Sequence, residues 1–343
     1  MAASEQTSSL KTVAPALYCI VALIIVASFL FVHLLSLGFF FFASEGLALS
    51  TLPFRFPVFL FFFFGDYTPF FQARDVFVVI WVIYVLCFVA AWRWNRSFHS
   101  VLKKALQGSR GFLGNFLFSM PLLSSTALTA AVAIIYMQMA FGVETGEPSL
   151  PSFLQLAVSP LAEELGFRIV PVGLVVAIFV FAASKSLKSS SVGGSRFKLF
   201  FLAFIYPEGA KKMAGLRTVG ENGLLKGLSS LEWFIVVVSA VAFGVTHVLS
   251  PEWEIGKITS ASVQGFFFAV TYVAYGFEAP ILLHWFFNYY FYFFYPEVAE
   301  SFVPWAINLL SGIELLMLVL GVAGWIYFVW EGLRRVRKRR EST

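Results

Sequence analysis

The chain has 343 residues, of which 59% are hydrophobic and 13% are charged, and its mean hydropathy is +0.83. In soluble domains about a quarter of all residues are charged, so this composition excludes a water-soluble globular protein. The formal charge of +5 comes largely from a basic tail at 334–340 and requires no nucleic-acid partner. The two cysteines, Cys19 and Cys87, lie in apolar runs and suggest neither a disulfide framework nor a thiolate metal site.

Apolar runs near or above the ~20 residues needed to cross a bilayer recur along the chain. Only helices and closed barrels satisfy their backbone polar groups in lipid, and these runs lack the alternation of barrel strands. The predicted fold class is therefore all-α, a polytopic transmembrane helical bundle with about eight spanning helices. The spans are expected at about 15–43, 76–92, 112–141, 151–184, 231–249, 260–276, 280–295 and 302–330.

Three segments outside these spans have their own interpretation. Residues 1–14 are polar and are predicted to form a disordered tail. The segment 54–64 is strongly apolar but too short to cross, and Pro53 and Pro57 interrupt it, so an interfacial or re-entrant segment is expected. The connection 185–228 is rich in Gly, Ser and Lys and is typical of a mobile surface loop with a short interfacial helix.

Charges in the loops predict the orientation. The loops 93–110 and 185–228 and the C-terminal tail are rich in Lys and Arg, whereas the alternate loops carry acidic residues such as Glu144 and Glu252. Lys/Arg-rich loops belong in the cytoplasm. We therefore expect an integral, multi-pass membrane protein with both termini cytoplasmic and its basic tail against anionic lipid headgroups.

Ionisable side chains inside predicted spans are costly and indicate function by default. Two of them stand apart from the rest. His33 is expected to hydrogen-bond between helices, and Glu314 is expected to hydrogen-bond while protonated, to line a cavity or to pair with Arg168. The complete set is His33, Glu163, Glu164, Arg168, His247, His284 and Glu314.

Glu163, Glu164 and Arg168 form the first cluster. Glu164 and Arg168 are four residues apart and can pair on one helix face. Glu163 lies about 100° around the helix from Glu164, so it can face another partner. An uncommitted carboxylate in a cavity of low dielectric constant suits a general base. A purely structural Glu–Arg pair between helices is the alternative interpretation.

The second and third clusters are Phe243-x-x-x-His247 and His284-x-x-x-Asn288. Spacing of four residues places His284 and Asn288 on one helix face, so the two side chains are expected to project together. With Glu163, His247 and His284 can bind a metal that retains an open water position. Alternatively, these groups activate water directly while His284 and Asn288 stabilise an oxyanion.

The ordered series Glu-Glu-x-x-x-Arg, Phe-x-x-x-His and His-x-x-x-Asn on successive spans resembles the CPBP family. This family comprises CAAX-protease and bacteriocin-processing intramembrane endopeptidases, including the Rce1 type. The resemblance covers about 150–295 and implies a catalytic core at about 146–300, between N-terminal helices at 15–145 and a last helix with its tail at 301–343.

The resemblance also implies a role for each residue of the motifs. Glu163 would polarise water with His247, Glu164 and Arg168 would support that site, and His284 and Asn288 would stabilise the oxyanion. A divalent metal such as Zn²⁺ is a candidate cofactor. The substrate would be a peptide or a prenylated CAAX-type protein. The site would open to the cytoplasm, with the connection 185–228 as a rim or lid.

Two other classes of function remain open. One is a proton-coupled transporter in which Glu163, Glu164 and Glu314 form a relay, although no internal repeat of the kind found in many carriers is visible. The other is a non-catalytic immunity or scaffold protein with the same fold.

The predicted topology contains one conflict. His247 lies at the outer end of its span, whereas His284 follows closely after the inner end of another, so a shared site requires a helix end within the membrane. The segment 250–258 is the expected place for this dip.

Overall fold

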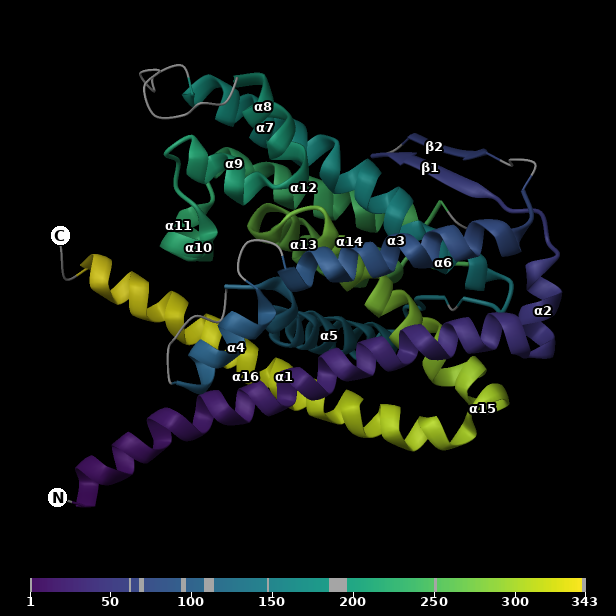
Figure 1. Cartoon of the computed structure of the whole chain (residues 1–343), viewed down its shortest axis with the longest axis horizontal. Helices are drawn as coiled ribbons and strands as arrows, with labels where there is room; N and C mark the ends of the chain where they lie inside the picture. The colour runs from purple at the N-terminus through teal and green to yellow at the C-terminus, as the bar shows by residue number, and fades with distance from the viewer. Residues whose placement is uncertain are drawn as a thin grey trace.

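The computed structural model describes residues 2–61, 63–67, 71–93, 97–107, 114–146, 148–184, 196–249 and 252–340. Within these ranges the regular secondary structure is helical apart from one β-hairpin (Figure 1). The helices are α1 (Ala2–Phe42), α2 (Ser44–Ser50), α3 (Ala73–Arg93), α4 (Phe98–Leu106), α5 (Phe116–Ala140), α6 (Ser152–Glu164), the π-helical turn η1 (Leu165–Ile169), α7 (Pro171–Ala183), α8 (Arg196–Ile205), α9 (Pro207–Met213), α10 (Val219–Asn222), α11 (Leu224–Gly227), α12 (Ser230–His247), α13 (Lys257–Tyr275), α14 (Glu278–Phe286), the π-helix η2 (Phe287–Val298), α15 (Ala299–Phe302) and α16 (Pro304–Arg340). The strands are β1 (Phe56–Leu60) and β2 (Phe63–Tyr67).

Six helical segments are long and apolar enough to cross a membrane. They are Pro15–Phe42, Ala73–Arg93, Phe116–Ala140, Ser152–Ala183, Ser230–His247 and Pro304–Arg334. The polytopic all-α bundle predicted from the sequence is therefore confirmed. The other two predicted spans form α13 and α14–η2, which are shorter or less apolar, and every residue of α14 is buried. Among the described residues, six helices are thus long and apolar enough to cross, compared with the eight spans predicted.

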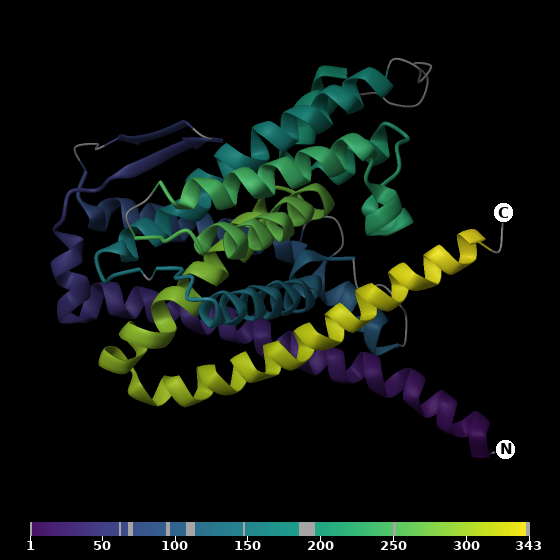
Figure 2. The same ribbon diagram turned by 180° about the vertical axis from the view of Figure 1, so that it is seen from behind.

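Both termini lie at the same end of the bundle, and the hairpin, α2 and α15 lie at the opposite end (Figures 1 and 2). We call these the terminus end and the hairpin end. The arrangement agrees with the prediction that the termini share one side. The predicted disordered tail differs, because α1 is helical from Ala2 onward.

The apolar segment after Pro53 forms the antiparallel hairpin, with Phe56 opposite Tyr67 and Leu60 opposite Phe63. Strand β1 packs against α6 and η1. A Cβ atom on Gly166 would collide with the backbone oxygen of Phe59, so this close approach requires glycine. An open sheet edge is not stable against lipid tails, which places the hairpin at the membrane interface or against protein.

The connection 185–228 is more ordered than its composition predicts, from Arg196 onward; residues 185–195 lie outside the described ranges. Helices α8–α11 form a cap at the terminus end, which we call the α8–α11 cap. A buried ion pair joins this cap to α12, with Lys211 Nζ 2.7 Å from Glu232 Oε1. The ammonium also donates to the Gly227 carbonyl at 2.7 Å. Glu208 accepts hydrogen bonds from the backbone N–H groups of Val219 and Gly220.

The α8–α11 cap covers the turn between α13 and α14. Phe277 N donates to the Ile205 carbonyl at 3.0 Å, and Tyr272 Oη donates to the Phe204 carbonyl at 2.9 Å. Gly276 adopts φ +121° in this turn, a conformation that side chains disfavour. Glu278, the first residue of α14, is buried, with 4% of its surface exposed. The inner end of α14 therefore lies inside the protein, not at the membrane surface.

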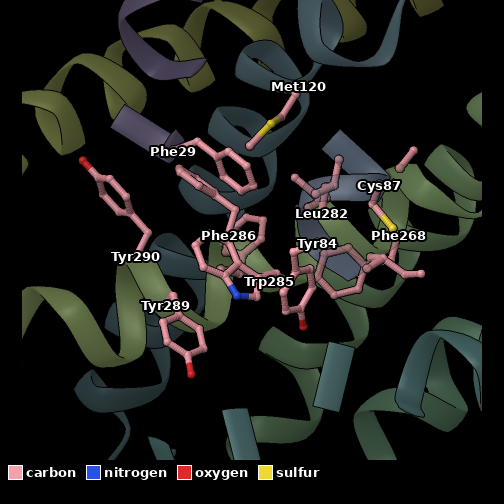
Figure 3. Close-up of a cluster of buried hydrophobic side chains, with 14 of the residues drawn as sticks. Phe29, Tyr84, Cys87, Met120, Phe268, Leu282, Trp285, Phe286, Tyr289 and Tyr290 are labelled. Carbon is pink, nitrogen blue, oxygen red and sulfur yellow. The ribbon is translucent and has the colours of Figure 1, made fainter. Parts of the chain in front are cut away.

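A core of aromatic side chains joins the N-terminal helices to α14 (Figure 3). The indole of Trp285 is fully buried and packs edge-on against Phe29 of α1 and Trp81 of α3. Tyr84 Oη donates to the Ala157 carbonyl at 2.6 Å and so ties α3 to α6. Large buried aromatic rings dominate core energetics, so α1 and α3 support the helix that carries His284.

Candidate active site

Two π-helical segments shape the candidate site. The turn η1 follows Glu164 directly and contains Arg168, and η2 begins one residue before Asn288. Bulges of this type change the direction of side chains within a helix and are frequent at functional sites. Spacing of four residues in the sequence therefore does not translate here into the regular face of an α-helix.

Glu164 and Arg168 pair as predicted, in a fully buried environment. Arg168 Nη1 lies 3.1 Å from Glu164 Oε1, and both side chains have no exposed surface. Arg168 Nη2 donates to the Gly265 carbonyl at 3.3 Å, and the guanidinium lies 4.1 Å from the ring centre of Phe243. The forked guanidinium thus links the motif helix to α12 and α13.

The same carboxylate oxygen of Glu164 also holds His284. His284 Nδ1 lies 2.8 Å from Glu164 Oε1, and its ring stacks on Phe268. A carboxylate accepts hydrogen bonds, so Nδ1 carries the proton and donates. The other ring nitrogen, Nε2, then faces Glu163 Oε2 at 3.7 Å. This distance exceeds that of a direct hydrogen bond.

His247 has its tautomer fixed by the backbone. Its Nδ1 lies 2.7 Å from the Phe243 carbonyl oxygen, which can only accept. Nδ1 therefore carries the proton, and Nε2 keeps its lone pair. Such a second contact fixes both the ring orientation and the basic nitrogen.

Asn288 closes the back of the site. Its Nδ2 donates to Ser159 Oγ at 2.9 Å and to the Leu156 carbonyl at 3.3 Å. Residue 160 is proline and has no N–H to donate to Leu156, four residues earlier. The side chain of Asn288 thus satisfies a carbonyl that Pro160 leaves without its helical partner. Both amide hydrogens of Asn288 have acceptors.

Two adjoining cavities connect these side chains to the surface. The inner cavity, of about 50 Å³, is lined by Glu163, His247, His284 and Asn288 among others. This volume holds more than one water molecule. The larger cavity, of about 560 Å³, lies under the hairpin, and we call it the vestibule. Five residues line both, namely Gln155, Glu163, His247, Glu252 and Trp253.

The sequence predicted that His247 and His284 lie near opposite ends of their spans. The positions of two helix ends explain how both residues line one cavity. The start of α14 is buried beneath the α8–α11 cap, so His284 lies deep in the protein. On the other side, Glu252, Trp253 and Lys257 line the inner cavity, which agrees with the expected dip of the segment 250–258; residues 250 and 251 lie outside the described ranges.

The predicted metal ligands Glu163, His247 and His284 line one cavity but do not form a ligand group. Among the described residues, no three His, Cys, Asp or Glu side chains are arranged to hold a metal ion. Nδ1 of each histidine is engaged, by Phe243 or by Glu164, which leaves Nε2 as the nitrogen that could bind a metal. As they are placed here, however, the three side chains do not form a three-ligand zinc site.

Some lining residues are missing from the sequence-based set. Gln155 and Ser159 precede Glu163 by eight and four residues on α6, so they share its helix face and line the inner cavity. That spacing is a signal that the sequence contains. Lys257 and Gln264 of α13 also line the cavity, and Lys257 Nζ lies 3.7 Å from the ring centre of Trp253. No motif indicates these two residues.

His33 and Glu314 lie apart from the cavities. The ring of His33 stacks on Trp81, and Trp81 Nε1 donates to the backbone carbonyl of His33 at 3.2 Å. In the part of the chain that the structure describes, His33 Nε2 has no hydrogen-bond partner. Its role is thus aromatic packing between α1 and α3. Glu314 of α16 is half-buried and lines neither cavity, and Arg168 pairs with Glu164 instead.

Comparison with known proteins identifies one related family. A family model described as type II CAAX prenyl endopeptidase Rce1-like matches residues 145–290. The matched region runs from just before α6 to the start of η2 and contains all six motif residues. No curated protein and no solved structure matches the chain significantly.

Proposed function

We propose that this chain is an intramembrane endopeptidase with Glu163 at its catalytic centre, because residues 145–290 match the model of the Rce1-like family, a family of proteases. One observation carries the proposal. Glu163 and His247 line both an inner cavity with room for water and the larger vestibule that joins it. Water and a peptide can therefore meet at these two side chains.

Glu163 and His247 are suited to hold and activate water. The carboxylate and His247 Nε2 are both acceptors, so one water can donate a hydrogen to each and direct a lone pair at a substrate carbonyl. Glu163 Oε2 has no hydrogen-bond partner among the described residues, and its side chain is 12% exposed. As general base, Glu163 takes the proton of the attacking water and passes it to the leaving amine.

His284 is suited to stabilise the oxyanion. Because Nδ1 donates to Glu164, the ring can donate from Nε2 only as an imidazolium, and the buried carboxylate of Glu164 stabilises that charge. Arg168 pairs with Glu164, and its positive charge offsets one of the two negative charges of Glu163 and Glu164. Asn288 already donates to Ser159 and Leu156, so we assign it to positioning α6 against η2 rather than to the oxyanion.

No step of this proposal passes through a metal, because the three predicted ligands do not form a group here. We expect proteolysis to persist after treatment with EDTA. Loss of activity on chelation, with recovery on addition of Zn²⁺, would replace direct water activation with metal-assisted hydrolysis.

The family suggests a substrate cleaved near its C-terminus, including prenylated CAAX-type proteins. The transporter alternative relies on a relay through Glu314, and that residue lines neither cavity. The scaffold alternative predicts no turnover at all. These alternatives therefore separate in an activity measurement.

The test is peptide cleavage in proteoliposomes, read by mass spectrometry, with prenylated and unmodified peptides. Wild type is compared with Glu163→Gln, which keeps the shape of the side chain but removes the base. Loss of a general base lowers kcat about 10²- to 10⁴-fold. Equal cleavage by both proteins would overturn the assignment of Glu163. A folded wild type that cleaves no peptide on the panel would favour the scaffold alternative.

A further inference from the structure

The vestibule has walls from three parts of the chain, and all three lie at the hairpin end. Its roof is the segment around β1, and its walls are α6, through Leu154 and Gln155 near the start and Glu163 near the end, and the C-terminal end of α12 with the residues that follow. In both views these elements lie opposite the two chain termini (Figures 1 and 2). No lining residue of either cavity belongs to the described part of the connection 185–228. The described part of the connection therefore gives no support to its expected role as a rim or lid.

The two ends differ in basic residues. At the terminus end, Lys103 and Lys104 end α4, and further cations lie on α8, α9 and α11. At the hairpin end, the described basic residues are Arg55, Arg74 and Lys257, and they are outnumbered by acidic ones. Acidic residues of the hairpin end include Glu45, Asp75, Glu144, Glu252, Glu254 and Glu300. The bias of Lys and Arg marks the cytoplasmic side, so it assigns the terminus end to the cytoplasm.

These two facts conflict with a site that opens to the cytoplasm. A basic terminus end on the cytoplasmic side and a cavity at the opposite end can coexist only if the cavity opens away from the cytoplasm. We propose that the substrate enters the vestibule from the non-cytoplasmic face of the membrane and binds there as an extended, largely apolar peptide segment. The claim that the ligand is a peptide substrate rests on the proposed function. The claim about the side from which it enters does not.

The lining of the vestibule supports this class of ligand. Most of its side chains are apolar or aromatic, including Leu52, Phe54, Phe59, Leu154, Leu249 and Trp253. Most of its polar groups lie on the wall shared with the inner cavity, namely Gln155, Glu163, His247 and Glu252, whereas Arg55 and Thr246 line the vestibule alone. A mostly apolar chamber with a few polar groups is typical of a substrate site. A peptide bound there reaches Glu163 from the hairpin side.

The direction is tested by labelling single cysteines in sealed membrane vesicles of known orientation. The native Cys19 and Cys87 are buried. Gln155→Cys reports on the vestibule, and Lys212→Cys on the exposed terminus end, where that side chain is 65% exposed. We expect a membrane-impermeant maleimide to label Gln155→Cys only from the non-cytoplasmic side, and Lys212→Cys only from the cytoplasmic side. Labelling of both from one side, or the reverse pattern, would overturn the proposal.

Occupation of the vestibule by substrate is tested with a bulky side chain at its mouth. Leu249 is 60% exposed and lines the vestibule, and Leu225 of α11 is 53% exposed at the terminus end and serves as the matched control. We expect Leu249→Trp to raise KM about tenfold and Leu225→Trp to leave KM unchanged. An unchanged KM in both variants would exclude the vestibule as a substrate site. The labelling needs no turnover, so it still decides the direction if wild type proves inactive.

Discussion

Arg168 combines full burial with a charge and a fork-shaped hydrogen-bonding group. It contacts Glu164 with Nη1 and the Gly265 carbonyl with Nη2, and neither member of the ion pair is exposed. Removing one partner of a buried pair typically costs about 3–5 kcal/mol, because the other charge stays buried without compensation. We expect Arg168→Ala to lower the free energy of unfolding by about this amount, measured by thermal unfolding in detergent.

A lysine at position 168 provides a sharper comparison. Lysine retains the charge but cannot span two acceptors with a planar fork. We expect Arg168→Lys to recover only part of the lost stability and to leave His284 less firmly held through Glu164. Full stability in Arg168→Ala would contradict the pairing itself.

Asn288 and Pro160 form a second testable unit through the Leu156 carbonyl. Asn288→Ala leaves that buried acceptor without a partner, at a cost of about 1–3 kcal/mol. Pro160→Ala restores a backbone N–H that can donate to Leu156. In a double-mutant cycle followed by thermal unfolding, we therefore expect Pro160→Ala to be less destabilising, or stabilising, when Asn288 is already alanine. Strictly additive effects would exclude this coupling.

The residue types of the site were predictable, but their hydrogen bonds were not. The spacing of Glu164 and Arg168 predicted their pairing, and that pairing is confirmed. The bond from His284 to Glu164 joins residues 120 positions apart and depends on how α14 packs. Asn288 bonds to the Leu156 carbonyl because Pro160 has no backbone N–H to donate there, and no pattern of side chains in the sequence indicates this bond.

At the scale of elements, the contact between β1 and η1 places the roof of the vestibule directly over the first motif. A Cβ atom on Gly166 would meet the Phe59 backbone. We expect Gly166→Ala to displace β1 and to lower kcat/KM and the unfolding temperature together. Gly312→Ala is the matched control, because Gly312 lies in helix α16 with open space around its Cα. Equal behaviour of the two variants would show that the hairpin does not lie on η1.

The elements also show where local sequence patterns fail. Hydropathy predicted the long helices because lipid-facing surface requires continuous apolar runs. It did not predict the hairpin at 56–67, since pairing of two short strands leaves no long-range signal in a run of phenylalanines. From its composition, the connection 185–228 was predicted to be a surface loop. Composition cannot distinguish an exposed lysine from Lys211, which is buried against Glu232. Tertiary contacts decide these elements.

At the scale of the whole molecule, the Rce1-like region is not a self-contained body. The family model covers residues 145–290, yet Trp285 within it packs on Phe29 and Trp81, which lie outside it. Tyr84 also donates to the Ala157 carbonyl beside the first motif. The helices α1 and α3 therefore hold α14 and α6 in position, and the site depends on parts of the chain that carry none of its motifs.

This dependence predicts the behaviour of a divided chain. Because burial of large aromatic rings supplies much of the core energy, we expect residues 114–343 alone to aggregate or to unfold at much lower temperature than wild type, as judged by size-exclusion chromatography and thermal unfolding. Co-expression with residues 1–107 should restore a monodisperse complex and its peptide cleavage, because the contacts of Trp285 and Tyr84 are then available again. If residues 114–343 alone are stable and active, α1 and α3 do not support the site, and the aromatic core of Figure 3 has no catalytic consequence.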